Sequence, residues 1–170
     1  MKTDNLMRQI RVEKLTLNIG TKGDPEHLKK GVSLLTAISH RKVVETKAKK
    51  RLAAWKLRPG LPIGAKVTLR GEYAEKIFKN LLVAIEKKIS KKSFNPGNFS
   101  FGVKEYIDIP EVKYDPKIGI IGLEASVTLE RPGFRIKKRR LSNKRLPLKH
   151  QITTEDTIKF VQEAFGVEVI

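Results

Sequence analysis

Two stretches of the chain are dense in cations and almost free of acids, and the chemistry they suit is phosphate binding. Residues 41–70 contain ten Lys or Arg and a single acid, Glu45, and residues 131–150 contain nine more cations and no acid. Like charges at this density repel one another unless an anion neutralises them. We therefore expect a polyanionic partner, RNA or DNA, whose phosphates supply most of the affinity and make it dependent on salt.

The overall composition supports the same class of partner and excludes several others. The 170 residues include 36 Lys and Arg against 18 Asp and Glu, a formal charge of +18. No apolar run approaches the roughly 18 residues that span a bilayer, and residues 1–9 lack the apolar core of a secretion signal, so we expect a cytoplasmic protein with no membrane partner. Because the chain has no Cys, disulfides, thiolate zinc sites and thiol nucleophiles are excluded.

The side chains that could serve catalysis or metal binding lack the spacing that such sites need. His27, His40 and His150 share no metal-ligand spacing, and the acids between 105 and 115 have no His among them. The turn at Gly20–Gly23 precedes a helix start but is not followed by the Lys-Ser or Lys-Thr of a nucleotide-binding loop. We expect no enzyme, no cofactor and no metal.

Alternating apolar residues predict the strands that must position the cations. Leu15, Leu17 and Ile19 alternate with Thr16 and Asn18, which predicts a strand over 11–19. The same pattern predicts strands over 63–69, where the polar positions are Lys66, Thr68 and Arg70, and over 121–129. Further strands are expected at 42–46 and 103–109, and the Pro132-Gly133 pair predicts a hairpin whose second arm is 134–141.

Capping residues and apolar stripes predict three helices. Asp24 followed by Pro25 is a strong helix start, and an apolar stripe predicts a long helix over 72–90. A last helix starts at Thr153 or Thr154 and ends at Gly166. The order β-α-β-β-α-β predicts an α+β, two-layer fold. It has a mainly antiparallel sheet with helices on one face, a split-βαβ core as in ferredoxin-like and RNA-recognition domains, extra strands and a C-terminal helix. We expect residues 1–170 to form one domain with a basic loop, 47–61, and a basic segment, 131–150.

The polar face of the predicted sheet is a second candidate binding surface. Thr16 and Asn18 share it with the polar residues of the 63–69 strand, and amide and hydroxyl groups can bind bases, ribose or phosphate. An ordinary hydrated sheet face is the alternative. Trp55, the only Trp, lies within the basic loop and either stacks on a base or anchors the loop.

Five ordered motifs resemble one family, the universal large-subunit ribosomal protein that carries 5S rRNA, number five of its subunit. They are Leu17-Asn-Ile-Gly20, Thr46-Lys-Ala-Lys-Lys50, Arg58-Pro-Gly-Leu-Pro-Ile-Gly64, Lys66-Val-Thr-Leu-Arg-Gly71, and Gly97-Asn-Phe-Ser-Phe-Gly102 followed by Lys104-Glu105. The match runs from about Val12 to Phe165. Tyr114-Asp-Pro-Lys-Ile-Gly119 and Arg131-Pro-Gly-Phe134 resemble the archaeal and eukaryotic branch, and the compact length indicates the archaeal type.

The resemblance implies a non-catalytic protein that docks 5S rRNA onto 23S rRNA in the central protuberance, beside neighbouring ribosomal proteins. It implies 5S rRNA contacts at Asn18 and Thr68, and Arg41, where bacterial members place a Gln nearby, is expected to bind a phosphate. The full 5S rRNA set is Asn18, Arg41, Thr46, Lys47, Lys49, Lys50, Lys66, Thr68 and Arg70. The resemblance also implies a loop facing the P-site tRNA, here Arg51, Trp55, Lys56, Arg58 and Gly60. Other rRNA contacts are expected from Arg135, Lys137, Lys138, Arg139, Arg140, Lys144 and Arg145.

Two alternatives stay open beside the ribosomal hypothesis. The first is a basic RNA-binding chaperone or regulator outside the ribosome with the same fold, and the second is an enzyme acting on RNA. Binding confined to 5S rRNA would separate the ribosomal protein from a chaperone or regulator. Processing of RNA without added proteins would favour the enzyme.

Overall fold

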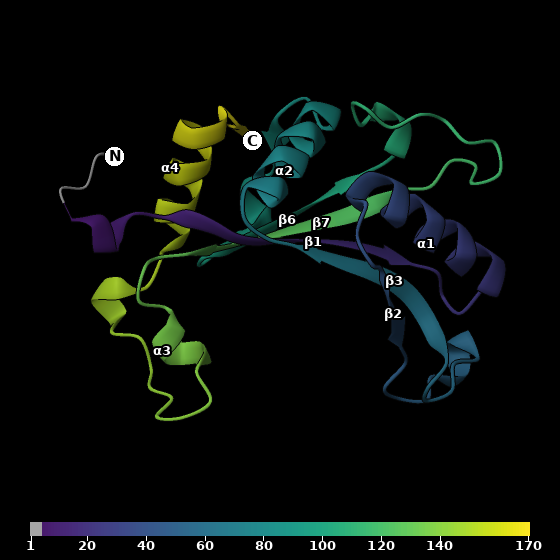
Figure 1. Cartoon of the computed structure of the whole chain (residues 1–170), viewed down its shortest axis with the longest axis horizontal. Coiled ribbons are helices and arrows are strands. Elements are labelled where there is room, and N and C mark those ends of the chain that lie inside the picture. Colours follow the sequence, from purple (N-terminus) through teal and green to yellow (C-terminus); the bar gives the residue numbers. More distant parts are fainter. Residues whose placement is uncertain (1–4) are drawn as a thin grey trace. The chain divides into compact units, whose positions relative to one another are not determined.

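The computed structural model of the chain describes residues 5–170 (Figure 1). It has a six-stranded, mainly antiparallel sheet in the order β2-β3-β1-β7-β6-β5 and a separate two-stranded sheet of β4 and β8. The strands are β1 (Arg11–Gly20), β2 (Val44–Lys47), β3 (Pro62–Leu69), β4 (Lys88–Ile89), β5 (Phe94–Asn95), β6 (Asn98–Val103), β7 (Leu123–Glu130) and β8 (Glu168–Val169). The helices are α1 (Pro25–Ser39), α2 (Glu72–Ala84), α3 (Arg135–Lys138) and α4 (Thr154–Phe165).

The strand order confirms the split-βαβ core and the α+β class. β3 lies between β2 and β1, and β7 lies on the other side of β1, so four strands take the order 2-3-1-4 of that motif. The fourth strand of the core is β7 and not the expected segment 103–109. The strands predicted over 11–19, 63–69 and 121–129 are confirmed to within two residues at each end.

The chain divides into two compact units. The first contains the described residues up to Leu15, together with Arg70–Phe101 and Ser126–Ile170, and the second contains Thr16–Leu69 and Gly102–Ala125. β1, β6 and β7 each contribute residues to both units.

The second unit is built by packing α1 against β1 and β3. Asp24 caps α1 by accepting a hydrogen bond from the Glu26 amide through Oδ1 at 3.0 Å, and Pro25 takes the first helical position as predicted. Gly31 lets this helix approach β1, since a Cβ there would lie 3.3 Å from Cγ2 of Ile19. The buried alternation along both strands leaves their opposite face open to solvent.

The first unit is held by a cluster of aromatic rings. Phe78 of α2 packs edge-on against Phe99 of β6 and Phe165 of α4, with ring centroids 5.8 and 4.7 Å apart. A reciprocal capping box joins Thr153 to Asp156 at the start of α4, and Gly166 ends the helix in the left-handed conformation. The predicted start and end of this last helix are therefore confirmed.

The long helix predicted over 72–90 is wrong at its C-terminal end. α2 ends at Ala84, and Glu86 and Lys87 follow with positive φ angles of 53° and 57°, which an α-helix cannot contain. Ile89, which the apolar stripe placed on the helix, lies instead in β4, which pairs in parallel with β8.

The strand predicted over 103–109 is also wrong. β6 ends at Val103, and Tyr106 begins a single 3-10 turn with its side chain fully buried. The Tyr106 hydroxyl accepts a hydrogen bond from the amide of Asp115 at 3.0 Å. This contact ties the turn to the loop that leads to β7.

The hairpin predicted at Pro132-Gly133 does not form. The turn leads into α3, and residues 134–141 make no returning strand. Cations occupy five of these eight positions, and side chains repelling one another favour an exposed segment over a paired strand.

Candidate nucleic-acid interface

The polar face of the second unit carries the predicted hydroxyl, amide and ammonium groups together. Thr16 and Asn18 project from β1, and Lys66 and Thr68 project from β3, all at least partly exposed. β2 pairs antiparallel with β3, and Thr46 lies opposite Gly64, so its side chain shares this face. The structure therefore brings four predicted 5S rRNA residues, Asn18, Thr46, Lys66 and Thr68, onto one surface.

Gly64 sets the spacing of the strands on that surface. A Cβ at this position would lie 2.6 Å from the carbonyl oxygen of Ile19 and 3.1 Å from Oγ1 of Thr46. Only glycine permits this approach, because real Cβ atoms do not come so close to backbone oxygen. Gly64 therefore lets β1, β2 and β3 lie close together on this face.

The amide of Asn18 is oriented by an acid that the predicted site did not include. Its Nδ2 donates a hydrogen bond to Oε2 of Glu124 on β7 at 3.1 Å. The alternation over 121–129 already places Glu124 on the polar side, so the sequence held the signal. The predicted set contains cationic, amide and hydroxyl side chains but no acid, so it leaves this carboxylate out.

The basic loop is an ordered structure with its cations outside. The amide of Ala48 donates to the Leu61 carbonyl at 2.8 Å, and Gly60, at φ +87°, donates to the Ala48 carbonyl at 2.9 Å. The loop cations are all exposed and make no ion pair with any described residue: Lys47, Lys49, Lys50, Arg51, Lys56 and Arg58. Trp55 is 62% exposed, so its indole does not anchor the loop. Arg41, just beyond the left-handed cap of α1, is also exposed.

Two of the predicted RNA-binding cations belong to an internal ion-pair network of the first unit. Glu13 accepts from Lys138 Nζ at 2.7 Å and from Arg70 at 3.2 Å, and Glu130 accepts from Lys138 at 3.0 Å and from Arg11 at 2.6 Å. Through Lys138 this network holds α3 on the side of the sheet opposite α2, as Figure 1 shows.

The protonation states of the network follow from these contacts. Burial opposes ionisation of Glu13, whose side chain is only 9% exposed, but hydrogen bonds from Lys138 and Arg70 outweigh it and hold the pKa of this carboxyl below its usual value. Burial likewise opposes the charge on Lys138, and its bonds to Glu13 and Glu130 raise the pKa of the ammonium. Both partners stay charged at neutral pH.

Three of the remaining cations of the basic segment line a hollow of about 560 Å³ in the first unit. Lys137, Lys144 and Arg145 line it with Phe134 and Asn143, and no acid does so. None of these three cations has an ion pair with any described residue. Arg139 differs, since its Nε donates to the Ser142 carbonyl at 2.8 Å, and Arg135 and Arg140 are exposed. The basic segment therefore contains cations of two kinds, those with internal partners and those free to meet phosphate.

Arg131, the first cation of the segment, is a buried anchor. Its guanidinium donates to the carbonyls of His150 and Gln151 at 3.4 and 3.0 Å and to Oδ2 of Asp156 at 3.0 Å. Burial opposes ionisation of Asp156, but bonds from the backbone and side chain of Thr153, with the Arg131 charge, lower the pKa of the carboxyl.

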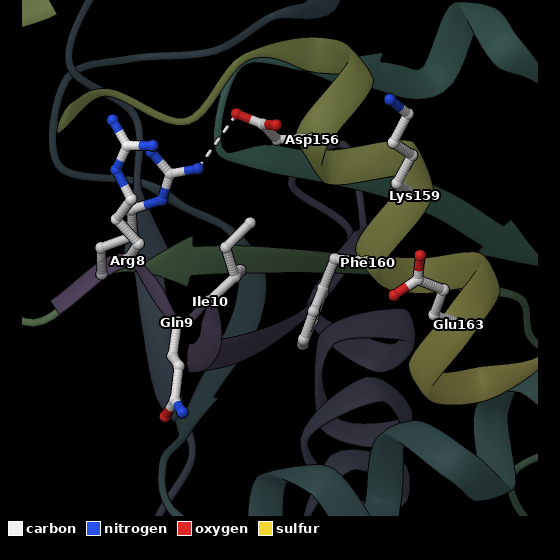
Figure 2. Close-up of a pocket in the computed structure, with 8 residues that line it drawn as sticks. Arg8, Gln9, Ile10, Asp156, Lys159, Phe160 and Glu163 are labelled. Carbon is white, nitrogen blue, oxygen red and sulfur yellow. Dashed lines mark hydrogen bonds and ion pairs between the residues drawn. The ribbon is translucent and has the colours of Figure 1, made fainter. Parts of the chain in front are cut away.

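Beside this anchor is a pocket of about 90 Å³, drawn in Figure 2. Its walls carry both signs of charge, Arg8 and Lys159 against Asp156 and Glu163, and the side chains of Ile10 and Phe160 project toward it. Mixed charge and small volume distinguish it from the predicted phosphate-binding surfaces.

Residues 5–170 contain no group of three His, Asp or Glu side chains that could hold a metal ion. Within the same range, no helix is both long and apolar enough to cross a membrane.

Comparison with known proteins gives matches along nearly the whole chain. Residues 5–58 match the family described as ribosomal protein L5, and residues 62–160 match the C-terminus of the same ribosomal protein family. The chain is 52% identical over 165 residues to a protein of Nanoarchaeum equitans named large ribosomal subunit protein uL5, covering 96% of this chain and 98% of that protein. A protein of the same name from Methanococcoides burtonii is 42% identical over 166 residues, covering 97% and 98%. One from Sulfurisphaera tokodaii is 41% identical over 170 residues, covering 99% and 96%.

Proposed function

Because the chain belongs to the ribosomal protein L5 family, we propose that it binds 5S rRNA on the polar face of its second unit and attaches it to 23S rRNA in the central protuberance. The chain is a structural constituent of the large subunit of the cytoplasmic ribosome, of the archaeal type, and not an enzyme. Its partners are rRNA and other ribosomal proteins.

The observation that carries the 5S rRNA assignment is the composition of the open face. Asn18, Thr68 and Thr16 offer hydrogen bonds there, Lys66 attracts phosphate, and neither β1 nor β3 presents an aromatic ring on which bases could stack. Such a surface suits folded RNA recognised by its shape, ribose hydroxyls and phosphates, and not a single strand recognised by stacking.

The test is the Asn18→Ala, Thr68→Ala double variant in an equilibrium titration with 5S rRNA. Both side chains are at the surface, so we expect 5S rRNA binding to weaken about tenfold or more while the thermal midpoint stays near that of the wild type. Unfolding of the double variant would make the two residues structural, and unchanged affinity would remove them from the interface.

We assign the loop Arg51–Gly60 to the P-site tRNA. The loop presents Lys56, Arg58 and the indole of Trp55 to solvent, and its backbone hydrogen bonds hold them in place. Guanidinium, ammonium and an exposed indole can together bind a tRNA backbone and stack on an unpaired base.

We assign the basic segment to a second rRNA surface, on which only some of its cations bind phosphate. Lys137, Lys144 and Arg145 face the 560 Å³ hollow without internal partners, whereas Lys138 is already neutralised by two carboxylates. This surface in the first unit can hold a different rRNA strand from the one on the second unit, as a protein joining two RNAs requires.

A further inference from the structure

A glycine-lined hollow of about 530 Å³ lies on the polar face of the second unit, beside Asn18. Three strand ends contribute to it: the end of β1, the end of β6 and the start of β7. The glycines are Gly20, Gly102 and Gly122, and the polar side chains around them are Asn18, Lys104 and Glu124. Strand alternation places Asn18, Gly20, Gly102 and Glu124 on the polar face, and Lys104 and Gly122 lie one residue after β6 and one residue before β7.

The hollow is open because side chains are missing from it. A Cβ at Gly20 or Gly102 would meet no heavy atom within 4 Å. At Gly122 a Cβ would lie 2.7 Å from the carbonyl oxygen of Lys104, so the backbone just after β6 and the backbone just before β7 approach closely there. A ligand can therefore come near the backbone of three strands at once.

Glu124 is an unexpected residue for a surface that binds phosphates. Several other acids of the chain pair with cations, as Glu13, Glu130 and Asp156 do. Glu124 is exposed and has no cation partner among the described residues; its hydrogen bond comes from the amide of Asn18. A carboxylate here repels phosphate and accepts hydrogen bonds, so it suits a ligand group that donates hydrogen bonds.

The hydrogen bond between the two side chains determines what Asn18 offers to a ligand. An ionised carboxylate only accepts hydrogen bonds, so the amide nitrogen of Asn18 must face Glu124 and the amide oxygen must face away. The pair then presents acceptors to a ligand: Oδ1 of Asn18 and the second oxygen of Glu124. Its partner must supply donors, which a phosphate lacks.

An RNA helix supplies such donors along its minor groove. That groove is wide and shallow and displays ribose 2′-hydroxyls, whereas the deep major groove excludes side chains. The 2-amino group of guanine is the base donor in the minor groove. We propose that Asn18 and Glu124 bind a guanine 2-amino group and a neighbouring 2′-hydroxyl in the minor groove of an RNA helix seated over the glycine hollow, with Lys104 next to the flanking phosphate.

This inference rests on the proposed function, since it assumes that RNA binds on this face. The first test compares Glu124→Gln with Glu45→Gln in titrations against a 5S rRNA transcript. Both changes remove one negative charge; Glu45 is an exposed acid opposite Ala65 in the β2–β3 pair, on the other face of the sheet. The two variants therefore separate loss of a contact from loss of general repulsion.

We expect Glu124→Gln to weaken 5S rRNA binding about tenfold, the cost of one good base contact, and Glu45→Gln to leave it unchanged or slightly tighter. If Glu124 were only a repulsive surface acid, both variants would bind 5S rRNA as tightly as the wild type or more tightly. That result overturns the proposal. Thermal midpoints of both variants equal to that of the wild type exclude misfolding. If the wild type shows no preference for 5S rRNA over tRNA, the proposed function fails independently of Glu124.

The second test uses 5S rRNA transcripts with inosine scattered in place of guanosine, which removes the 2-amino group. Transcripts that the protein fails to bind identify the guanines it needs. For the wild type, we expect inosine to weaken binding at one or more guanosine positions. At one or more of these positions, inosine should no longer weaken the binding of Glu124→Gln. An identical pattern for both proteins contradicts the assignment.

A third variant tests entry into the hollow. Gly102→Val adds a side chain where the fold leaves space and where the backbone is not left-handed. We expect it to fold and to bind 5S rRNA several-fold more weakly, and unchanged affinity would show that RNA does not enter the hollow.

Discussion

Glu13 is the acid on which the ion-pair network of the first unit depends, and Glu13→Gln tests that network. The substitution keeps the shape of the side chain and removes its charge. Lys138 loses its shorter carboxylate contact, 2.7 Å, and keeps Glu130 at 3.0 Å. Arg70 loses its contact at 3.2 Å, the one carboxylate it meets within residues 5–170. The variant therefore weakens the attachment of α3, but Lys138 of this helix keeps its ion pair with Glu130.

The magnitude follows from the burial of the three groups. Hydrogen bonds to charged groups contribute about 1.5–3 kcal/mol, and exposed ion pairs contribute at most about 1 kcal/mol. The Glu13 side chain is 9% exposed, but Lys138 and Arg70 are 45% and 60% exposed and regain water when the contact is lost. We expect the free energy of unfolding to fall by about 1–2 kcal/mol, which lowers the thermal midpoint of a chain this size by about 2–8 °C.

The pH dependence of the difference is a second readout of the same contact. Because the pKa of Glu13 is depressed in the folded chain, its stabilisation is complete above the ordinary value of 4.5 and is lost as the pH falls through the folded pKa. In urea or thermal unfolding, the gap between wild type and variant should be full at pH 7 and should close on acidification below about 4.5.

Glu45→Gln is the control, since it changes the net charge equally at an exposed acid with no ion pair to a described residue. A Glu13→Gln midpoint indistinguishable from that of the control at pH 7 would refute the structural role of the network. It would also return Lys138 and Arg70 to the cations available for RNA.

Three further predictions concern the sheet, the basic segment and the basic loop. Gly64→Ala places a Cβ 2.6 Å from a backbone oxygen of β1, so we expect unfolding free energy to fall by about 1–3 kcal/mol in a urea titration. Lys144→Ala with Arg145→Ala should reduce the slope of log affinity for 23S rRNA against log salt by about 1.4–1.8, with the thermal midpoint unchanged. Lys56→Ala with Arg58→Ala should leave 5S rRNA affinity unchanged and weaken binding to tRNA in the same titration format; a loss of 5S rRNA affinity would place the loop on that RNA instead.

The elements predicted correctly are those whose signals lie within a few residues. Alternation at Leu15, Leu17 and Ile19 is enough to define β1, because one buried face forces a period of two. Asp24 and Gly166 fix helix ends through local hydrogen bonds and a left-handed backbone. The polar face follows from the same alternation.

The errors arise where distant residues decide the local structure. Ile89 continues the apolar stripe of α2, but pairing of β4 with β8, some 80 residues away in the chain, gives it another buried position. Tyr106 looks like part of a strand and is held in a turn by the backbone of Asp115. Neither partner can be recognised from the segment alone.

The prediction of the candidate site used the same local signals. The exposed cations of the basic loop and the polar residues of β1 and β3 needed only charge density and alternation. The assignment of Lys138 and Arg70 to RNA could not anticipate their pairing with Glu13, because that contact joins three segments far apart in the sequence. Glu124 was left out because the predicted set contained cationic, amide and hydroxyl side chains, which attract or bind RNA, and no acid.

The central claim is specific binding of 5S rRNA, and one equilibrium titration tests it most directly. The complete chain is titrated with purified 5S rRNA against tRNA and duplex DNA as competitors, at several salt concentrations. We expect a strong preference for 5S rRNA that persists near physiological salt, because contacts to ribose and base are less sensitive to salt than phosphate contacts. Equal binding to all three, lost together as salt rises, would mean that only the charge of +18 is at work and would contradict the account.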